Sequence, residues 1–176
     1  LRIEKEKSNR FDRKRAWILE YMKGHEYIVM DPVPDYNPDI VGDIHAMPFT
    51  DDSEGAIICL AVLEHVENPI LAVQEVRRVL QQGGVALFYV PFLFYYPAEK
   101  GYYKDYWRFS HDAIGYLSKD FSKLEMAKVR GALETWVHLS PLGRLPGVHE
   151  IARFIDTVTG KDKSNQVSGY YVYAQK

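Results

Sequence analysis

The stretch of sequence that decides the fold covers residues 38–91 and reads PDIVGDIHAMPFTDDSEGAIICLAVLEHVENPILAVQEVRRVLQQGGVALFYVP. Residues 56–61 form a continuous apolar run that is too short for a helix, and residues 85–90 form a second one. Strands that are apolar on both sides and joined by a helical segment are typical of a parallel sheet covered on both faces. The sequence therefore predicts strand, helix and strand within an α/β sheet.

The link between the two apolar runs has the spacing of an amphipathic helix. Asn68 and Pro69 are good helix starters, and Gly83 and Gly84 predict the end. A right-handed crossover places the carboxyl ends of both strands at one edge, where open α/β sheets bind their ligands. We therefore expect the site near residues 60–65 and 91–96.

Composition limits the possible classes of protein. The chain has 176 residues, of which 47% are apolar, so it fits one domain over residues 1–176. A net charge of −2 gives no reason to expect nucleic acid as a partner. The single cysteine, Cys59, lies in the central apolar run, as a core residue in a reducing compartment would. No apolar run reaches the ~20 residues that span a bilayer, so we expect a cytoplasmic protein without membrane contact.

Two acidic residues close consecutive extended segments. Residues 27–30 (YIVM) predict a short strand that ends at Asp31, and residues 39–43 (DIVGD) predict a second extended segment that ends at Asp43. These acids would face one crevice, one suited to a ribose diol and the other to an exocyclic amine. The alternative for Asp31 is a turn-forming role before Pro32.

Histidines and an acid follow the same strand ends. Glu64 and His65 come directly after the central strand and are suited to acid or base chemistry, or to a hydrogen bond that fixes the loop. His45 is an isolated histidine beside a turn, for which packing or capping is the more frequent role. No cluster of Cys, His and Asp predicts a metal site.

The series DIHAMPF, a hydrophobic strand, LEHV, RVLQQGG and a strand ending in VPF resembles the class I S-adenosylmethionine-dependent methyltransferases, over roughly residues 27–116. The resemblance implies a Rossmann-like, doubly wound, mostly parallel seven-stranded sheet with an antiparallel C-terminal strand. It also implies S-adenosylmethionine as the cofactor. In that family the first acid binds the ribose hydroxyls, the second lies near the adenine amine, and the residue after it packs on adenine. The positions of this chain that match the cofactor site are Asp31, Pro32, Asp43, Ile44, Leu60 and Ala61.

One departure from the family concerns its glycine-rich loop. The family's first strand leads into E/D-x-G-x-G-x-G, whereas here LRIE is followed by KEKSN and the first glycine is Gly24. Either such a loop is missing from the sequence near Glu4 and Lys5, or this part of the cofactor site is lost.

An aromatic segment, FLFYYPAEKGYYKDYWRF, follows the last central strand at residues 92–109. Its position predicts a wall or lid over the methyl group, and its DYWRF piece is similar to a motif in a subset of the same family. The candidate substrate-side residues are Tyr95, Tyr106, Trp107 and Arg108. The alternative is that the rings are core packing and that Arg108 pairs with a carboxylate such as Asp105.

The remainder fits the same architecture. Residues 111–121 predict a helix capped by Ser110, and residues 124–133 and 169–174 have strand character. In the family the last two strands are an antiparallel pair at one edge. A helical insertion at about residues 138–165 would close the substrate pocket or form the face of a homodimer.

The sequence thus predicts a single-domain methyltransferase acting on a small-molecule or glycan-type acceptor. Methyl transfer is an in-line displacement that depends mostly on alignment and on exclusion of water. A base is required only for an acceptor with a high pKa, and the candidates are Glu64, His65, His111 and Tyr103. One alternative is an inactive methyltransferase-like scaffold. Another is a nucleotide-sugar or NAD enzyme, but the LEHV and VGDIHAMPF segments match the methyltransferase pattern better.

Overall fold

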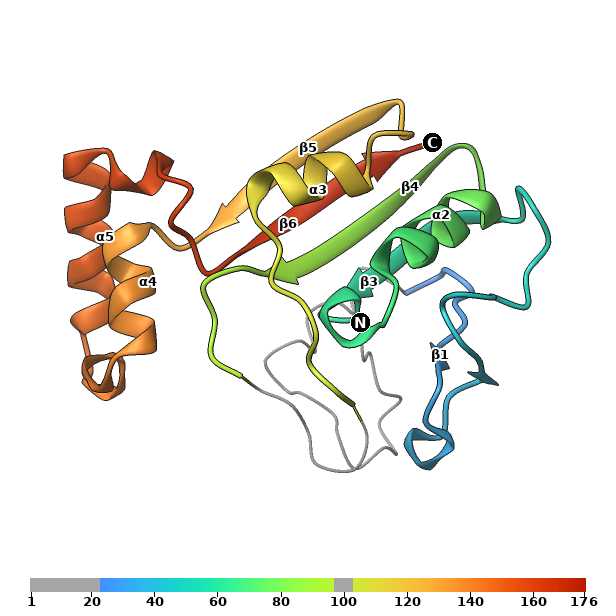
Figure 1. The fold of residues 1–176 in the computed structure, drawn as a ribbon, viewed down its shortest axis with the longest axis horizontal. Coiled ribbons are helices and arrows are strands. Elements are labelled where there is room, and N and C mark those ends of the chain that lie inside the picture. Colours follow the sequence, from blue (N-terminus) through green and yellow to red (C-terminus); the bar gives the residue numbers. More distant parts are fainter. Residues whose placement is uncertain (1–22, 97–102) are drawn as a thin grey trace.

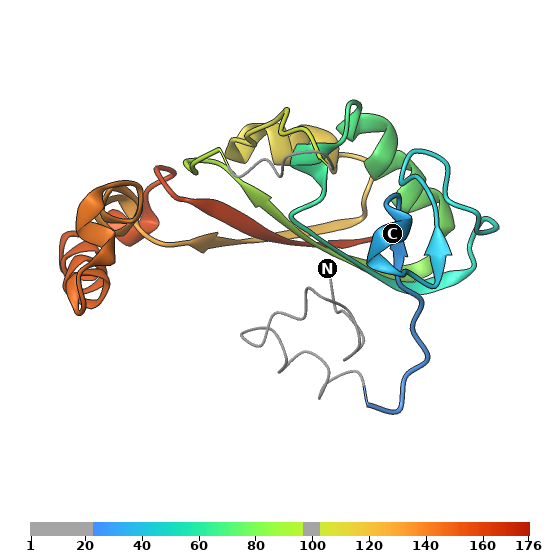
Figure 2. The ribbon, with the colours of Figure 1, turned by 90° about the horizontal axis from the view of Figure 1, so that it is seen from below.

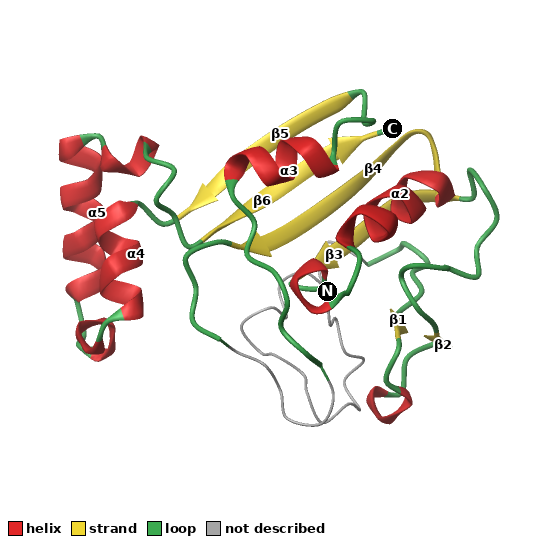
Figure 3. Cartoon of the chain, viewed as in Figure 1, coloured by secondary structure: helices red, strands yellow, loops and turns green. Residues whose placement is uncertain are grey.

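A computed structural model describes residues 23–96 and 103–176 of the chain. Its main sheet has four strands in the order β3-β4-β6-β5, and a separate two-stranded sheet pairs β1 with β2 (Figures 1 and 3). The strands are β1 (Met30–Asp31), β2 (Ile40–Val41), β3 (Glu54–Leu60), β4 (Leu80–Pro91), β5 (Lys123–Val129) and β6 (Gly169–Gln175).

The main sheet is mixed. β3 and β4 are parallel, with Leu60 opposite Tyr89, while β6 is antiparallel to both of its neighbours. β3, β4 and β5 consequently run in one direction, and their carboxyl ends lie at the same edge. The strands expected at residues 56–61 and 85–90 and the antiparallel pair at one edge are present. The described residues form six strands of mixed orientation in two sheets, so the expected single seven-stranded, mostly parallel sheet is not what they show.

Two helices pack on the main sheet, α2 (Pro69–Val79) and α3 (His111–Leu117). The side chain of Asn68 accepts the N–H of Leu71, and that of Ser110 accepts the N–H of Ala113, so both predicted caps are present. Both helices lie on the same face of the sheet (Figures 1 and 2). The helix that the pattern of residues 12–24 predicts lies almost wholly outside the described residues, so helices on both faces stay a prediction.

Both helices end earlier than their glycine and periodicity signals indicate. α2 ends at Val79 because Leu80 is already extended, with ψ at 136°, and pairs with Glu54 of β3. Its side chain is fully buried, so packing decides this boundary rather than Gly83 and Gly84. α3 ends at Leu117, before the predicted residue 121.

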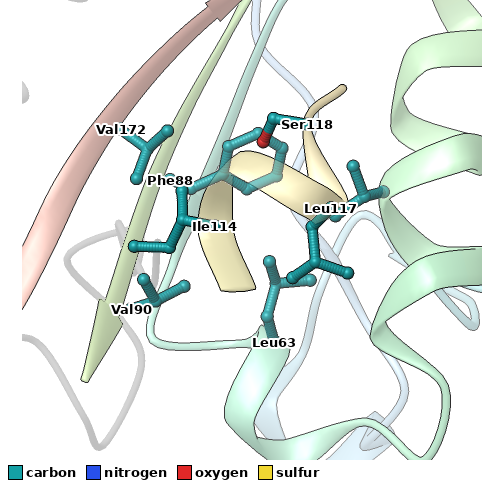
Figure 4. Close-up of a pocket in the computed structure, with 8 residues that line it drawn as sticks. Leu63, Phe88, Val90, Ile114, Leu117, Ser118 and Val172 are labelled. Atoms are coloured by element: carbon teal, nitrogen blue, oxygen red, sulfur yellow. The ribbon is translucent and has the colours of Figure 1, made fainter. Parts of the chain in front are cut away.

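The core lies between the sheet and these two helices. Figure 4 shows apolar side chains from β4, β6, α3 and the short 3₁₀ turn η3 (Leu63–His65) meeting there. They surround a gap of about 10 Å³, which is close to the volume needed for one water molecule. This gap is a packing defect of the core and is too small for a ligand. The residues around it are Leu63, Val73, Phe88, Val90, Ile114, Leu117, Ser118 and Val172.

A helical hairpin separates β5 from β6 in the sequence and extends beyond the end of the sheet (Figures 1 and 2). It consists of α4 (Ala132–Leu139) and α5 (Val148–Thr159), with the 3₁₀ turns η4 (Pro141–Arg144) and η5 (Lys161–Lys163). The insertion is thus helical from residue 132, not from about 138, and residues 130–133 are not strand.

The reason for the early start of α4 is a cap that comes from α5. The buried carboxylate of Asp156 accepts the N–H groups of Leu133 and Glu134, both at 2.9 Å, which satisfies free donors at the start of α4. A Cβ at Gly131 would lie 2.4 Å from Asp156 Oδ2, so glycine is required for this close approach.

The first short strand and its surroundings also differ slightly from expectation. β1 covers Met30–Asp31 rather than residues 27–30, and the 3₁₀ turn η2 (Pro34–Tyr36) follows it. The predicted strand at residues 1–4, the helix from Asp12 and the question of a glycine loop near residues 4 and 5 lie outside the described residues. No helix within residues 23–96 and 103–176 is long and apolar enough to cross a membrane.

Candidate functional site

Asp31 is the last residue of β1, whose parallel partner is β2. Its carboxylate accepts the hydroxyl of Tyr103 at 2.8 Å on Oδ1 and 3.0 Å on Oδ2. Oδ1 also accepts the N–H of Val33 at 2.9 Å, an Asx turn across Pro32. Asp31 therefore forms the turn before Pro32 that was the alternative to a binding role. Its carboxylate also accepts a hydrogen bond from a hydroxyl group.

Asp43 follows β2 and is bound by its own neighbour. Its Oδ1 accepts the backbone N–H of His45 at 2.9 Å and the His45 Nδ1–H at 2.7 Å. The backbone bond from His45 lowers the pKa of Asp43 most. Burial is the next largest effect and opposes it, and the side-chain bond and the charge of His45 lower the pKa further. His45 Nε2 accepts the N–H of Asn68 at 3.3 Å, which ties this loop to the start of α2. His45 is thus a capping residue.

Leu60 and Ala61 form the carboxyl end of β3. Leu60 is buried, and Ala61 has φ at 54°, in the left-handed region that residues other than glycine rarely adopt. The N–H of Ala61 donates to the carbonyl of Tyr89 at 3.0 Å, so the strained residue is held by β4. Ile44 packs on the edge of the core. Backbone strain of this kind is concentrated at functional sites.

Glu64 lies in the 3₁₀ turn η3 after this strained residue. Its side chain is only 3% exposed, and burial raises its pKa to about 7, with Asp105 adding to the effect and Arg108 opposing it. Within the described part of the chain, Glu64 Oε2 has no hydrogen-bond partner. The Glu64 carbonyl accepts the N–H groups of Tyr106 and Trp107 at 2.7 and 3.2 Å. These two bonds fix the DYWRF segment to the backbone of η3 at Glu64.

His65 is the last residue of η3, next to Glu64. Its Nδ1 donates to the carbonyl of Lys104 at 2.7 Å, which leaves the lone pair of a neutral ring on Nε2. Nε2 is 3.9 Å from Glu64 Oε1, too far for a hydrogen bond. The ring is 5.6 Å from that of Tyr103. Tyr103 thus lies between His65 at the end of β3 and Asp31 at the end of β1.

The fourth candidate base, His111, lies elsewhere. It begins α3, where its Nδ1 is 3.2 Å from Asp112 and its ring packs edge-on against Tyr170 at 6.1 Å. The structure brings Asp31, His65 and Tyr103 together, with Glu64 beside them, but places His111 against a different part of the sheet.

Arg108 forms a two-pronged ion pair with Asp105, with both nitrogen–oxygen distances at 2.6 Å. The Asp105 side chain is fully buried, and the guanidinium also donates to the carbonyls of Trp107 and Tyr95 at 2.7 and 3.0 Å. Such a pair fixes the path of the segment. This arrangement agrees with the structural alternative for Arg108.

The aromatic candidates remain largely accessible. Tyr106 donates to Glu67 Oε1 at 3.0 Å, and Trp107 Nε1 donates to the carbonyl of Val66 at 2.8 Å. Their exposures of 41% and 43% show that neither is a core residue. Tyr95 is 55% exposed, so all three rings can form a surface.

Two residues that the sequence did not single out join this aromatic surface. Phe94 stacks on Tyr95 with ring centres 4.3 Å apart, and His138 of α4 approaches them at 5.5 and 5.9 Å. His138 comes from the predicted insertion, and no motif marks it. Across residues 23–96 and 103–176, no group of three His, Cys, Asp or Glu side chains is placed to hold a metal ion.

Comparisons with known proteins also indicate a methyltransferase fold. A family model described as a methyltransferase domain matches residues 17–88. A SAM-dependent methyltransferase from Archaeoglobus fulgidus has a similar structure, with 13% identity, a TM-score of 0.63, and coverage of 92% of this chain and 82% of that one. An S-adenosylmethionine-dependent methyltransferase from Mesorhizobium loti matches with 14% identity, a TM-score of 0.52, and coverage of 91% and 86%. No curated protein matches the chain.

The family match covers the stretch with DIHAMPF and LEHV, and the structural likeness covers most of the chain. These two findings confirm the resemblance: residues 17–88 match the methyltransferase domain family, and the chain has the Rossmann-like fold of the class I S-adenosylmethionine-dependent methyltransferases.

Proposed function

We propose that the protein is an S-adenosylmethionine-dependent methyltransferase whose cofactor is held by Asp31 and Asp43 at the ends of β1 and β2. One observation carries the proposal: both oxygens of Asp31 accept a hydroxyl donor, that of Tyr103. A carboxylate in this state fits a ribose diol, which also presents hydroxyl donors. The family match over residues 17–88 supports the same cofactor.

The remaining cofactor residues have supporting positions. Ile44 lies directly after Asp43 and offers an apolar side chain for the adenine ring. Leu60 and the strained Ala61 form the wall at the end of β3. Bound between them, S-adenosylmethionine supplies a methyl group on a sulfonium, and the protein's task is to align an acceptor with it and to exclude water.

His65 is the group we propose as the base when the acceptor carries a proton. Its Nδ1–H bond to the Lys104 carbonyl holds the ring in the tautomer that leaves Nε2 able to accept a proton. Glu64 is buried beside it, so we assign Glu64 the role of positioning the loop and the imidazole. Tyr95, Tyr106 and Trp107 are then the surface for the acceptor. Exposed rings and a net charge of −2 favour a small-molecule or glycan-type acceptor over nucleic acid.

The test is calorimetric titration of S-adenosylmethionine into the protein and into Asp31→Ala. We expect Asp31→Ala to lose on the order of 1.5–3 kcal/mol of binding free energy, the usual contribution of hydrogen bonds to a charged group. Asp120→Ala is the matched control, because Asp120 is an exposed carboxylate just before β5, at the opposite end of the strands. Equal affinity in Asp31→Ala and the wild type would refute the assignment of Asp31.

The alternative of a catalytically inactive scaffold predicts a different result in the same experiment. An intact protein that stays folded but shows no heat of binding with the cofactor would support that alternative. The family match over residues 17–88 supports the active methyltransferase over this alternative.

A further inference from the structure

A hollow of about 380 Å³ lies where the helical hairpin joins the sheet. Positively charged side chains dominate its lining: three are cationic and one is a carboxylate, which leaves a surplus of two positive charges. The whole chain has a net charge of −2, so this surplus is local. The lining residues are Lys128, Val129, Arg130, Glu134, Arg153 and Tyr171.

Two of the three cations are not neutralised by an acid within the described residues. Arg153 pairs with Glu134, with Nη2 2.9 Å from Oε1. Lys128 Nζ donates to the backbone carbonyl of Lys163, and Arg130 Nη1 donates to Ser168 Oγ at 2.9 Å. Bonds to neutral oxygens leave the charges of Lys128 and Arg130 available to an anion.

The backbone of Arg130 gives a second, independent observation. Its φ is 66°, in the left-handed region, where a residue other than glycine costs about 1–3 kcal/mol. Glycine would adopt this conformation without strain, and it occurs at the next position, Gly131. An arginine is therefore held in a strained turn with its side chain lining the hollow.

The hollow adjoins the aromatic part of the candidate site. β5 runs parallel to β3 and β4, so Lys128 and Val129 lie at the same edge as Leu60. Ser168 connects the two regions, because its hydroxyl accepts from Arg130 and its carbonyl accepts the N–H of Phe92 at 2.9 Å.

The hairpin gives a second connection. The His138 ring packs 5.5 Å from that of Phe94, and burial, followed by the charge of Arg130, lowers the pKa of this histidine. His138 therefore lies beside the aromatic rings and is close enough to Arg130 to feel its charge.

We propose that this hollow binds a phosphate monoester group of the methyl acceptor. A phosphate monoester carries a charge of roughly −1.5 to −2 at pH 7, which matches the surplus, and guanidinium groups match the geometry of its oxygens. The link to an acceptor rests on the proposed function, but anion binding in the hollow does not.

Inorganic phosphate is the probe, titrated at constant ionic strength and followed by backbone NMR shifts. The wild type should show saturable shifts centred on residues 128–131 and on Arg153, and acetate should bind more weakly. Arg130→Gly should weaken phosphate binding roughly tenfold or more, since charge-assisted bonds are lost, while it relieves backbone strain. Its melting temperature should therefore be equal to that of the wild type or higher.

Two further variants test phosphate binding without a change in the backbone conformation of residue 130. Lys128→Ala removes an exposed cation of the hollow and should also weaken binding while the protein stays folded. Lys123→Ala is the control, because Lys123 lies at the other end of β5 and pairs with Glu125 at 2.7 Å, and it should leave phosphate affinity unchanged.

Absence of saturable shifts in the wild type, or equal phosphate affinity in Arg130→Gly, would overturn the proposal. A lower melting temperature in Arg130→Gly with phosphate binding retained would show that Arg130 is a structural residue. No cofactor is needed in these titrations. A protein that binds S-adenosylmethionine but not phosphate would refute this inference alone, and the reverse result would refute the proposed function alone.

Discussion

The hydroxyl of Tyr103 donates to both carboxylate oxygens of Asp31, at 2.8 and 3.0 Å, across 72 positions of sequence. Asp31 ends β1, and Tyr103 lies two residues before the DYWRF segment, so this contact joins the first sheet to the start of that segment. The hydroxyl occupies the oxygens that a ribose diol would use. Tyr103, a candidate base from the sequence, here donates to the carboxylate that we propose as the ribose-binding acid.

This position predicts that Tyr103 competes with the cofactor. Tyr103→Phe should bind S-adenosylmethionine several-fold more tightly, because a hydrogen bond to a charged group no longer has to be exchanged on binding. Calorimetry measures the affinity, and Tyr116→Phe is a control, because Tyr116 is an exposed tyrosine on α3. Weaker binding by Tyr103→Phe would contradict competition and show that the hydroxyl orients Asp31 for the cofactor.

Burial of Glu64 predicts a dependence of stability on pH. Its pKa of about 7 in the folded protein lies above the ordinary 4.5, so the folded state holds a proton that the unfolded state releases. The resulting stabilisation is complete below pH 4.5 and is lost as the pH rises through 7. Glu64→Gln, which resembles the protonated form, should match the wild type at pH 4 and exceed its free energy of unfolding at pH 8.5 by on the order of 3 kcal/mol.

Urea unfolding at a series of pH values measures this difference. Glu125→Gln is the control, because Glu125 is a surface residue whose side chain is 63% exposed. If the difference between Glu64→Gln and the wild type stays constant from pH 4 to pH 8.5, the raised pKa is refuted.

The ion pair between Arg108 and Asp105 predicts a structural phenotype. Lysine cannot form the two-pronged bond, so Arg108→Lys should lose about 1–3 kcal/mol of the free energy of unfolding. For a domain of this size, that loss lowers the melting temperature by several degrees. Cofactor affinity should be unchanged. Differential scanning calorimetry tests this, with Arg144→Lys as an exposed control. An Arg108→Lys protein of normal stability that loses turnover would instead place Arg108 at the acceptor.

The outer face of α5 predicts a homodimer. Ile151, Phe154, Ile155 and Val158 recur at helical spacing and are 61%, 69%, 40% and 69% exposed, and exposed apolar stripes commonly mark interfaces. Antiparallel packing of two α5 helices would place Glu150 of one copy near Lys161 of the other.

Phe154→Glu should therefore convert a dimer to a monomer in analytical ultracentrifugation. Tyr116→Glu, an exposed substitution on α3, should leave the dimer intact. A wild-type protein that sediments as a monomer at every concentration would refute the predicted dimer.

Local features of the sequence were sufficient for most elements. The apolar runs in β3 and β4, the caps at Asn68 and Ser110, and the period of α5 each depend on residues within a few positions of one another. Motif spacing likewise identified Asp31 and Asp43 as the acids at two adjacent strand ends. Hydrophobic period and capping act within one or two turns, so the sequence alone determines them.

Contacts between distant segments were decided only by the tertiary structure. α4 begins at Ala132 because a carboxylate from α5, Asp156, supplies its cap, and α2 stops at Val79 because Leu80 pairs with β3. The position of Tyr103 on Asp31 and of His138 beside Phe94 depends on the path of the whole chain. Side chains that meet across many residues leave no periodic signal in the sequence, because their partner is chosen by the packing of the sheet rather than by their neighbours.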